Sequence, residues 1–204
     1  MPALQAACSH RVIGERVSSR VESERVGRSE ADQLIVLVDA AQRGDRDAFG
    51  QLHERYARMV HGILLARVRK GEADDLVQDV FLRALEQLHT LRDGAMFGGW
   101  VAMIARHRAA DFRRRTRTTE ELPGDLAHRD EGASAEAAEV LAIIRELPAA
   151  YRETLVLRLV EGMSGPEIAA RTGLTPASVR VNLHRGMKQL RERLGHTFVA
   201  EERT

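Results

Sequence analysis

The sequence predicts an all-α protein made of two small helical domains joined by a flexible linker. Apolar residues recur every three or four positions over residues 32–115 and again over 137–195, as they do in amphipathic helices. Residues 116–136 lack this period and are rich in Thr, Gly, Pro, Asp and Glu, which is typical of an acidic linker. Aromatic residues make up only 4% of the chain, so we expect cores packed from Leu, Val and Ala.

Four helices are predicted in the first domain, with breaks where the apolar period is lost. The breaks fall at Gly44, at Lys70-Gly71 and in the loop 90–99. Residues 72–75, three of which are acidic, are predicted to open the third helix, because negative charge stabilises a helix N-terminus. The fourth helix is predicted to run from Trp100 to about Arg115.

The two ends of the chain are predicted to lie outside the domains. Residues 1–31 are rich in Arg, Glu, Ser and Gly and have too few apolar residues for a core, which predicts a disordered extension. A start codon assigned too far upstream would produce the same pattern. Residues 196–204 are predicted to form a C-terminal tail.

The second domain ends in the pattern of a helix-turn-helix. Ser164 and Glu167 have the spacing of a capping box, in which each side chain bonds to the backbone of the other. Gly173 suits the left-handed conformation that ends a helix. Thr175 can cap the following helix, with Pro176 in its first position.

The second helix of this motif is predicted to bury an apolar stripe and to present a cationic face. The cationic residues are Arg180, His184, Arg185, Lys188, Arg191 and Arg193. Such a helix fits the major groove of DNA. An ordinary helical hairpin with a solvated Arg face is the alternative, but it does not explain why caps, turn glycine and charge agree. In the same domain, Pro148 separates two further helices, and Leu155, Val156 and Leu159 are predicted to face inward.

The third predicted helix carries a face of mixed charge. Its exposed positions are Asp75, Gln78, Asp79 and Arg83. Mixed charge suits a specific protein interface better than DNA, whose phosphates repel the aspartates. A solvated amphipathic face is the alternative interpretation.

The fourth predicted helix is the second cationic segment of the chain. Residues 106–117 hold six arginines and one aspartate. Arginines can neutralise phosphates, while His107 and Asp111 can contact base edges.

Composition excludes several other classes of protein. The single Cys8 cannot form an internal disulfide, and no Cys/His cluster has zinc spacing. We find no Gly-rich phosphate loop and no pairing of a nucleophile with a base, so no catalytic residue, metal, cofactor or small-molecule substrate is predicted. No apolar run approaches the ~20 residues that span a bilayer, and no signal peptide is evident, so we expect a cytoplasmic protein.

Together these motifs resemble the sigma-70 family of bacterial RNA polymerase sigma factors, in the compact extracytoplasmic-function group. The resemblance runs roughly from Gln33 to Leu194. It is carried by Arg43-Gly44-Asp45, by the run Asp74 to Ala84, by Phe97, Trp100 and Ile104-Ala105-Arg106, by Leu147-Pro148 with Tyr151-Arg152, and by the helix-turn-helix. It implies a sigma-two domain at residues 32–115 and a sigma-four domain at 137–195, without the middle domain of housekeeping sigma factors.

The resemblance also implies a function and partners. Such a chain is an alternative sigma factor, a non-catalytic subunit that binds core RNA polymerase and directs promoter-specific transcription initiation. Its implied partners are the beta-prime clamp helices and the beta flap of core polymerase, promoter DNA and an anti-sigma factor. A helix-turn-helix regulator that acts without polymerase is the alternative, but it leaves the third and fourth helices unexplained.

Three sets of site residues follow from the resemblance. The polymerase-binding set is Asp75, Gln78, Asp79 and Arg83. The set for the downstream, minus-ten promoter element is Leu91, Arg106, His107, Arg108, Asp111, Arg114 and Arg115. The set for the upstream, minus-thirty-five element is Ser178, Arg180, Val181, Asn182, His184, Arg185 and Lys188. Two positions depart from the family's pattern: many relatives carry Asn where His107 stands, and some carry an aromatic residue where Leu91 stands.

Overall fold

The computed structural model describes residues 30–119 and 135–201, and within these ranges the chain is helical with short connections and no strand. The all-α prediction is therefore confirmed. The predictions for residues 1–29 and for most of the linker lie outside the described residues. The helices are residues 30–42, α2 (Arg46–Leu65), α3 (Lys70–Gln87), α4 (Phe97–Thr119), α5 (Ala135–Glu146), α6 (Ala149–Leu159), α7 (Gly165–Thr172) and α8 (Pro176–Glu201), with short 3-10 turns at Leu88–Thr90 and Gly94–Met96.

The first helical module is built around α2. Asp45 caps this helix by accepting hydrogen bonds from the backbone of Asp47 and Ala48. The apolar stripe of α2 is fully buried against α3 and α4. The helix at residues 30–42 is fixed to the same module by Gln42, whose side-chain amide donates to the backbone oxygens of Leu88 and Leu91 at 2.9 and 2.8 Å.

The second module is built around α6. Five successive residues of this helix, from Glu153 to Leu157, are buried, so α6 is covered on every side. Helices α5, α7 and α8 cover it from within the module, and α2 of the first module covers the remaining side. A helix with so wide a buried surface has no solvent-facing half at its centre.

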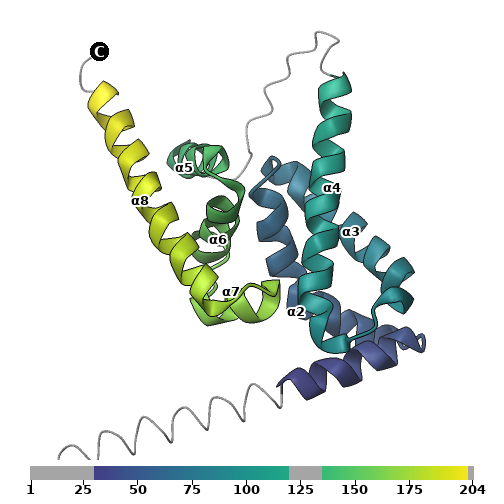
Figure 1. The fold of residues 1–204 in the computed structure, drawn as a ribbon. Coiled ribbons are helices and arrows are strands. Elements are labelled where there is room, and N and C mark those ends of the chain that lie inside the picture. The colour runs from purple at the N-terminus through teal and green to yellow at the C-terminus, as the bar shows by residue number, and fades with distance from the viewer. Residues whose placement is uncertain (1–29, 120–134, 202–204) are drawn as a thin grey trace, which may run out of the picture.

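The two modules pack directly against each other (Figure 1). Gly62 of α2 lies beneath Leu157 of α6 so closely that a Cβ atom at Gly62 would be 2.7 Å from the Leu157 side chain. Backbone oxygens of the first module accept hydrogen bonds from arginines of the second. Arg145 donates to the oxygen of Leu65 at 3.1 Å, and Arg171 donates to that of Arg55 at 3.0 Å.

Several local predictions differ from the structure. Helix α8 continues to Glu201, through most of the segment predicted as a C-terminal tail, and α4 continues to Thr119, past its predicted end near Arg115. Helix α3 begins at Lys70 rather than after Gly71, because the Glu72 side chain accepts from the Arg69 backbone at 2.9 Å and closes the first turn. Helix α4 begins at Phe97, three residues before Trp100. The prediction that Leu159 faces inward is wrong, since Leu159 is 48% exposed and Leu157 is buried against the first module in its place.

The early start of α4 has a packing cause. Gly98 lies in the first turn of α4, where it meets the end of α7. A Cβ atom at Gly98 would lie 2.3 Å from the backbone oxygen of Arg171 and 2.9 Å from the ring of Tyr56. Only glycine allows the two backbones to approach this closely. Phe97 beside it is fully buried, as expected of a core anchor, and packs on both Tyr56 and Trp100.

Candidate nucleic-acid and partner interfaces

The mixed-charge face of α3 is exposed. Asp75, Gln78, Asp79 and Arg83 all lie on the solvent side of the helix, at spacings that place them on one face. Leu82 lies among them and is 60% exposed. Leu82 was not among the residues predicted for this face, because only charged and polar positions were selected, although Leu82 falls outside the buried stripe. An exposed leucine surrounded by charges is typical of a protein-binding surface.

One member of this face is bonded to the cationic helix α4. The Asp79 carboxylate accepts a short hydrogen bond from Arg108, so the third and fourth helices are joined by an ion pair. The side chain of Asp79 remains 49% exposed, whereas that of Arg108 is only 27% exposed. Two residues predicted for different partners therefore contact each other in this structure.

The predicted downstream-element residues do not form a single surface. His107, Arg114 and Arg115 are exposed on α4, and Asp111 accepts a hydrogen bond from Arg114 at 2.7 Å. Leu91 is half-buried against the first module's core. The remaining two members, Arg106 and Arg108, are half-buried and bonded to carboxylates on other helices.

The helix-turn-helix has the geometry that its sequence predicts. Ser164 and Glu167 form a reciprocal capping box, whose hydrogen bonds with Ser164 lower the pKa of the Glu167 carboxyl. Gly173 adopts a left-handed conformation with φ of 75°. Thr175 accepts from the backbone N–H of Ser178 at 3.1 Å and so caps α8. These local bonds fix the angle between α7 and α8.

The predicted upstream-element residues lie along α8 and are open to solvent. Ser178, Arg180, Val181, His184, Arg185 and Lys188 are exposed, and Asn182 is half-buried. On the opposite side of the helix, Val179 and Leu190 are buried in the second module. A rigid helix with one buried stripe and one cationic face is positioned to enter a major groove.

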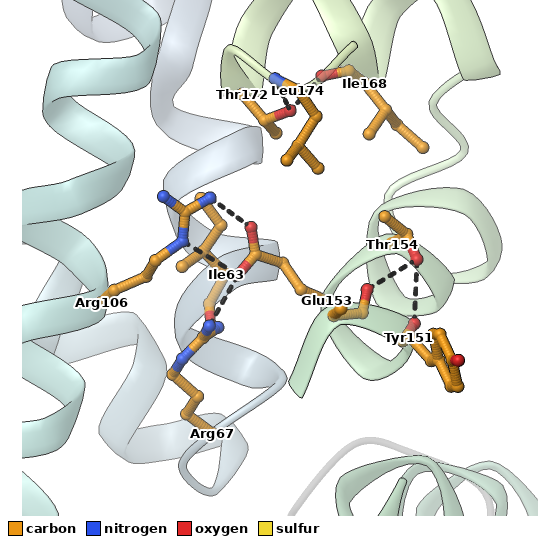
Figure 2. A network of polar contacts seen from close by, with 10 residues as sticks. Ile63, Arg67, Arg106, Tyr151, Glu153, Thr154, Ile168, Thr172 and Leu174 are labelled. Carbon is orange, nitrogen blue, oxygen red and sulfur yellow. Dashed lines mark hydrogen bonds and ion pairs between the residues drawn. The ribbon is translucent and has the colours of Figure 1, made fainter. Parts of the chain in front are cut away.

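A buried carboxylate, not predicted from the sequence, connects the two modules. Glu153 of α6 is 5% exposed and accepts hydrogen bonds from two arginines of the first module (Figure 2). Arg67, which lies just after α2, donates at 2.6 Å, and Arg106 of α4 donates two bonds at 2.6 and 3.1 Å. Burial alone would raise the pKa of Glu153, but the hydrogen bonds and charges of Arg106 and Arg67 outweigh it and lower that pKa.

A second junction lies around Glu161, which follows α6 and is 8% exposed. Its carboxylate is 2.6 Å from Nδ1 of His61 on α2, and its backbone oxygen accepts a short hydrogen bond from Arg58. Nε2 of His61 lies 3.2 Å from the Asp74 carboxylate on α3. The hydrogen bond to Glu161 raises the pKa of His61 against the opposing effect of burial, and the charges of Glu161 and Asp74 add to the rise.

No metal centre is found in the described part of the chain, where no three His, Cys, Asp or Glu side chains cluster as ligands. One cavity of about 300 Å³ lies between the turn that precedes α3, the later part of α4 and α5. It is lined mainly by arginines with one acidic residue, Glu72. None of the helices described is both long and apolar enough to cross a membrane.

Two cationic helices in separate modules, one of them in a helix-turn-helix, are typical of a DNA-binding protein, and α3 adds an exposed face of mixed charge around Leu82. Comparison with known proteins agrees with this class. Residues 52–119 match the family model Sigma-70 region 2, and residues 137–190 match Sigma-70, region 4. The chain belongs to the sigma-70 family of RNA polymerase sigma factors.

Named relatives place the chain in the extracytoplasmic-function (ECF) group of that family. The RNA polymerase sigma factor CarQ of Myxococcus xanthus is 35% identical over 161 residues, which are 74% of this chain and 92% of CarQ. The ECF RNA polymerase sigma factor BldN of Streptomyces coelicolor is 32% identical over 79% of this chain, which spans 66% of BldN. The chain is therefore an alternative sigma factor, and sigma factors are non-catalytic specificity subunits.

A solved structure shares the fold. CnrH, a sigma factor of Cupriavidus metallidurans, was solved in complex with the cytosolic domain of CnrY. It superimposes with a TM-score of 0.56 at 28% identity, over 80% of this chain and 97% of the CnrH chain. The prediction of two helical domains of the sigma type is thus supported by sequence and by structure.

Proposed function

We propose that this chain binds core RNA polymerase through the exposed face of α3 and selects promoters with α4 and α8. In this assignment the first module occupies residues 32–115 and the second 137–195. Asp75, Gln78, Asp79 and Arg83, with Leu82 at their centre, contact the clamp helices, and the second module contacts the beta flap. Because polymerase and chromosome share the cytoplasm in bacteria, we propose that location for the chain.

The observation that carries this proposal is the separation of three chemically different surfaces within one chain. Helix α8 presents exposed cations and polar groups beside a fixed turn, as a major-groove reader does. Helix α4 presents His107, Arg114 and Arg115 to solvent, which suits the downstream element. Helix α3 presents alternating charges around an exposed leucine, which suits a protein rather than DNA.

We further propose that an anti-sigma protein controls this chain. The support is the similarity to CnrH, whose solved structure holds a second protein, the cytosolic domain of CnrY. A partner that covers both modules would block polymerase and DNA at once. Pull-down from cells before and after stress should recover such a partner, and its release should accompany transcription. Free chain under all conditions would show that control lies elsewhere.

The proposal is tested first by association with core polymerase. The chain and core enzyme, mixed and separated by gel filtration, should elute together. The variant Asp75→Arg should reduce this association, whereas Glu139→Arg, a matched charge reversal at an exposed site on α5, should not. A chain that binds promoter fragments but never elutes with core enzyme would instead be a regulator that acts without polymerase.

A further inference from the structure

The cavity of about 300 Å³ beside the end of α4 is lined by a surplus of positive charge. Its walls come from the turn before α3, the last turns of α4, and α5. They contain four arginines and one acidic residue, namely Arg67, Arg69, Arg113 and Arg145, with Glu72. None of these residues belongs to the three sets proposed to bind polymerase or promoter DNA. The cavity is therefore a feature that the proposed function leaves unexplained.

The two carboxylates beside the cavity are already engaged. Glu72 accepts a hydrogen bond from the backbone N–H of Arg69 at 2.9 Å, so it serves the first turn of α3. Glu153 is bonded to Arg67 at 2.6 Å. Among the described residues, no carboxylate forms an ion pair with Arg69 or Arg113, and both of these lining residues are exposed. Their guanidinium groups are therefore available to an anion that enters the cavity.

A further arginine next to the lining shows the effect of this surplus. Arg152 donates to the backbone oxygen of Arg145 at 2.8 Å, and its Nε is buried with no hydrogen-bond partner in the described part of the chain. Burial, and after it the charges of Arg67 and Arg113, lower the pKa of Arg152. Cations gathered in a concave site attract an anion strongly, because the surrounding protein screens their field less than water does.

The size and the remaining walls of the cavity indicate which anion fits. Water occupies about 30 Å³ per molecule in the liquid, so the cavity has room for roughly ten waters, and a single phosphate would leave most of it empty. Its volume lies at the lower end of pockets that bind small organic ligands. Phe112 and Val68 supply apolar walls. An aromatic ring favours stacking with a nucleobase, and arginines bind phosphates through paired N–H donors.

We propose that this cavity binds a free nucleotide with two or more phosphates, which contact Arg69 and Arg113 while the base lies against Phe112. The lining has three more positive charges than negative ones. This surplus matches a nucleoside diphosphate, whose terminal phosphate carries about two negative charges and whose bridging phosphate carries about one. A strand of DNA offers the same two groups, phosphate and base, and is the other source of this chemistry.

Titration calorimetry on the full chain measures this binding, with ADP, pyrophosphate and a short single-stranded DNA that carries no promoter element as the probes. ADP should bind. Arg69→Gln and Arg113→Gln should each raise its dissociation constant at least about tenfold, because each removes a charge-assisted contact. The matched control is Arg46→Gln, at an exposed arginine that begins α2, whereas the cavity lies beyond the other end of that helix. This variant should bind ADP as tightly as the unchanged chain.

The aromatic wall has its own readout. Phe112→Leu keeps the wall apolar but removes the ring, so it should weaken ADP binding at least about fivefold and leave pyrophosphate binding unchanged. Equal losses for ADP and pyrophosphate in this variant would contradict the assignment of a nucleotide.

The same titrations can overturn the proposal in two further ways. The first is that ADP does not bind, or binds with an affinity that neither arginine variant changes. The second is that only the single-stranded DNA binds and loses affinity in Arg69→Gln and Arg113→Gln, which would make the cavity a contact for nucleic acid. Because the measurement contains neither polymerase nor a promoter, either failure leaves the proposed function untouched.

Discussion

Asp79 of α3 and Arg108 of α4 form an ion pair that joins the proposed polymerase-binding face to the proposed downstream-element helix. Reversal of the charge in Asp79→Arg should weaken association with core polymerase, because charge complementarity at an interface governs encounter. The same substitution replaces the ion pair with two adjacent positive charges, one at position 79 and one at Arg108. We therefore expect a small loss of thermal stability as well, within about 1 kcal/mol for a half-exposed pair.

These two effects are separated by a second variant. Asp75→Arg alters the same face without touching the Asp79–Arg108 pair, so it should weaken polymerase association with unchanged stability. Affinity for core enzyme is measured by fluorescence anisotropy, and stability by thermal denaturation. Normal affinity in both variants would remove α3 from the interface.

Leu82 should be a binding hot spot of the proposed polymerase-binding face, contributing more binding free energy than its neighbours. Its side chain is 60% exposed in the free chain, so Leu82→Asp should leave stability within about 0.5 kcal/mol. Burial of a leucine at an interface contributes about 1.5–3 kcal/mol, so affinity for core enzyme should fall at least tenfold. Val36→Asp, at a residue 65% exposed on another helix, is the matched control. Equal effects of the two substitutions would contradict the assignment.

The recognition helix makes a separate prediction. Arg185 and Arg191 are both exposed on α8, but only Arg185 belongs to the proposed base-reading set. Arg185→Ala should cost about 1–3 kcal/mol if the side chain contacts a base bidentately, and should relax preference at one upstream position. Arg191→Ala should weaken all sequences alike and reduce the salt dependence of binding.

Transcription from a promoter library by each variant distinguishes these outcomes. A shift of preference in the downstream element with Arg185→Ala would show that α8 does not read the upstream element. If Arg185→Ala lowers transcription from every promoter by the same factor, Arg185 contacts a phosphate and does not read a base.

Gly98 should be intolerant of a side chain. Its Cβ atom would lie 2.3 Å from a backbone oxygen, which cannot move aside as a flexible side chain can. Gly98→Ala should therefore destabilise the folded chain by about 1–3 kcal/mol, the usual cost of overpacking. Gly50→Ala is the matched control, since Gly50 lies at an exposed position of α2 with open space around it, and the substitution should gain about 0.4–1 kcal/mol of stability. If thermal denaturation shows that the two variants are equally stable, the close approach of Gly98 to the Arg171 backbone is refuted.

The contact between the two modules should depend on pH through His61. Its folded pKa is raised above the ordinary 6.5, so protonated His61 stabilises this contact fully below that value and loses the effect as pH rises through the raised pKa. The groups that face it are Glu161 and Asp74, with Arg58 bonded to the same Glu161. Stability against thermal denaturation should therefore fall as pH rises above about 6.5, the ordinary pKa of histidine. His61→Gln should remove that dependence, and an unchanged pH profile in this variant would assign it to another group.

Local features of the fold could be predicted because their causes are local in sequence. The capping box of Ser164 and Glu167, the left-handed Gly173 and the cap at Thr175 each depend on residues a few positions apart. The apolar stripe of α2 and the exposed charges of α3 follow from helical period alone. All of these predictions agree with the structure.

The contact between the modules could not be predicted in the same way. Glu153 precedes a run of buried residues, and nothing near it in sequence indicates that Arg67 and Arg106 neutralise it. Leu159 has the spacing of a core residue, yet α6 is rotated so that Leu157 meets Gly62 of the first module instead. Both features depend on contacts between residues that lie far apart in the chain. The helical period of apolar residues and the capping motifs describe only local structure, so they do not predict such contacts.

The central claim is that this chain gives RNA polymerase its choice of promoter, with α4 and α8 reading two separate elements. Run-off transcription of genomic fragments by purified core enzyme, with and without the chain, tests it most directly. Transcripts are expected only when both are present, from fragments that share two elements at a fixed spacing, and they should be lost when the spacing is altered by half a helical turn. Specific binding to fragments by the chain alone, with no transcription when core enzyme is added, would contradict the account.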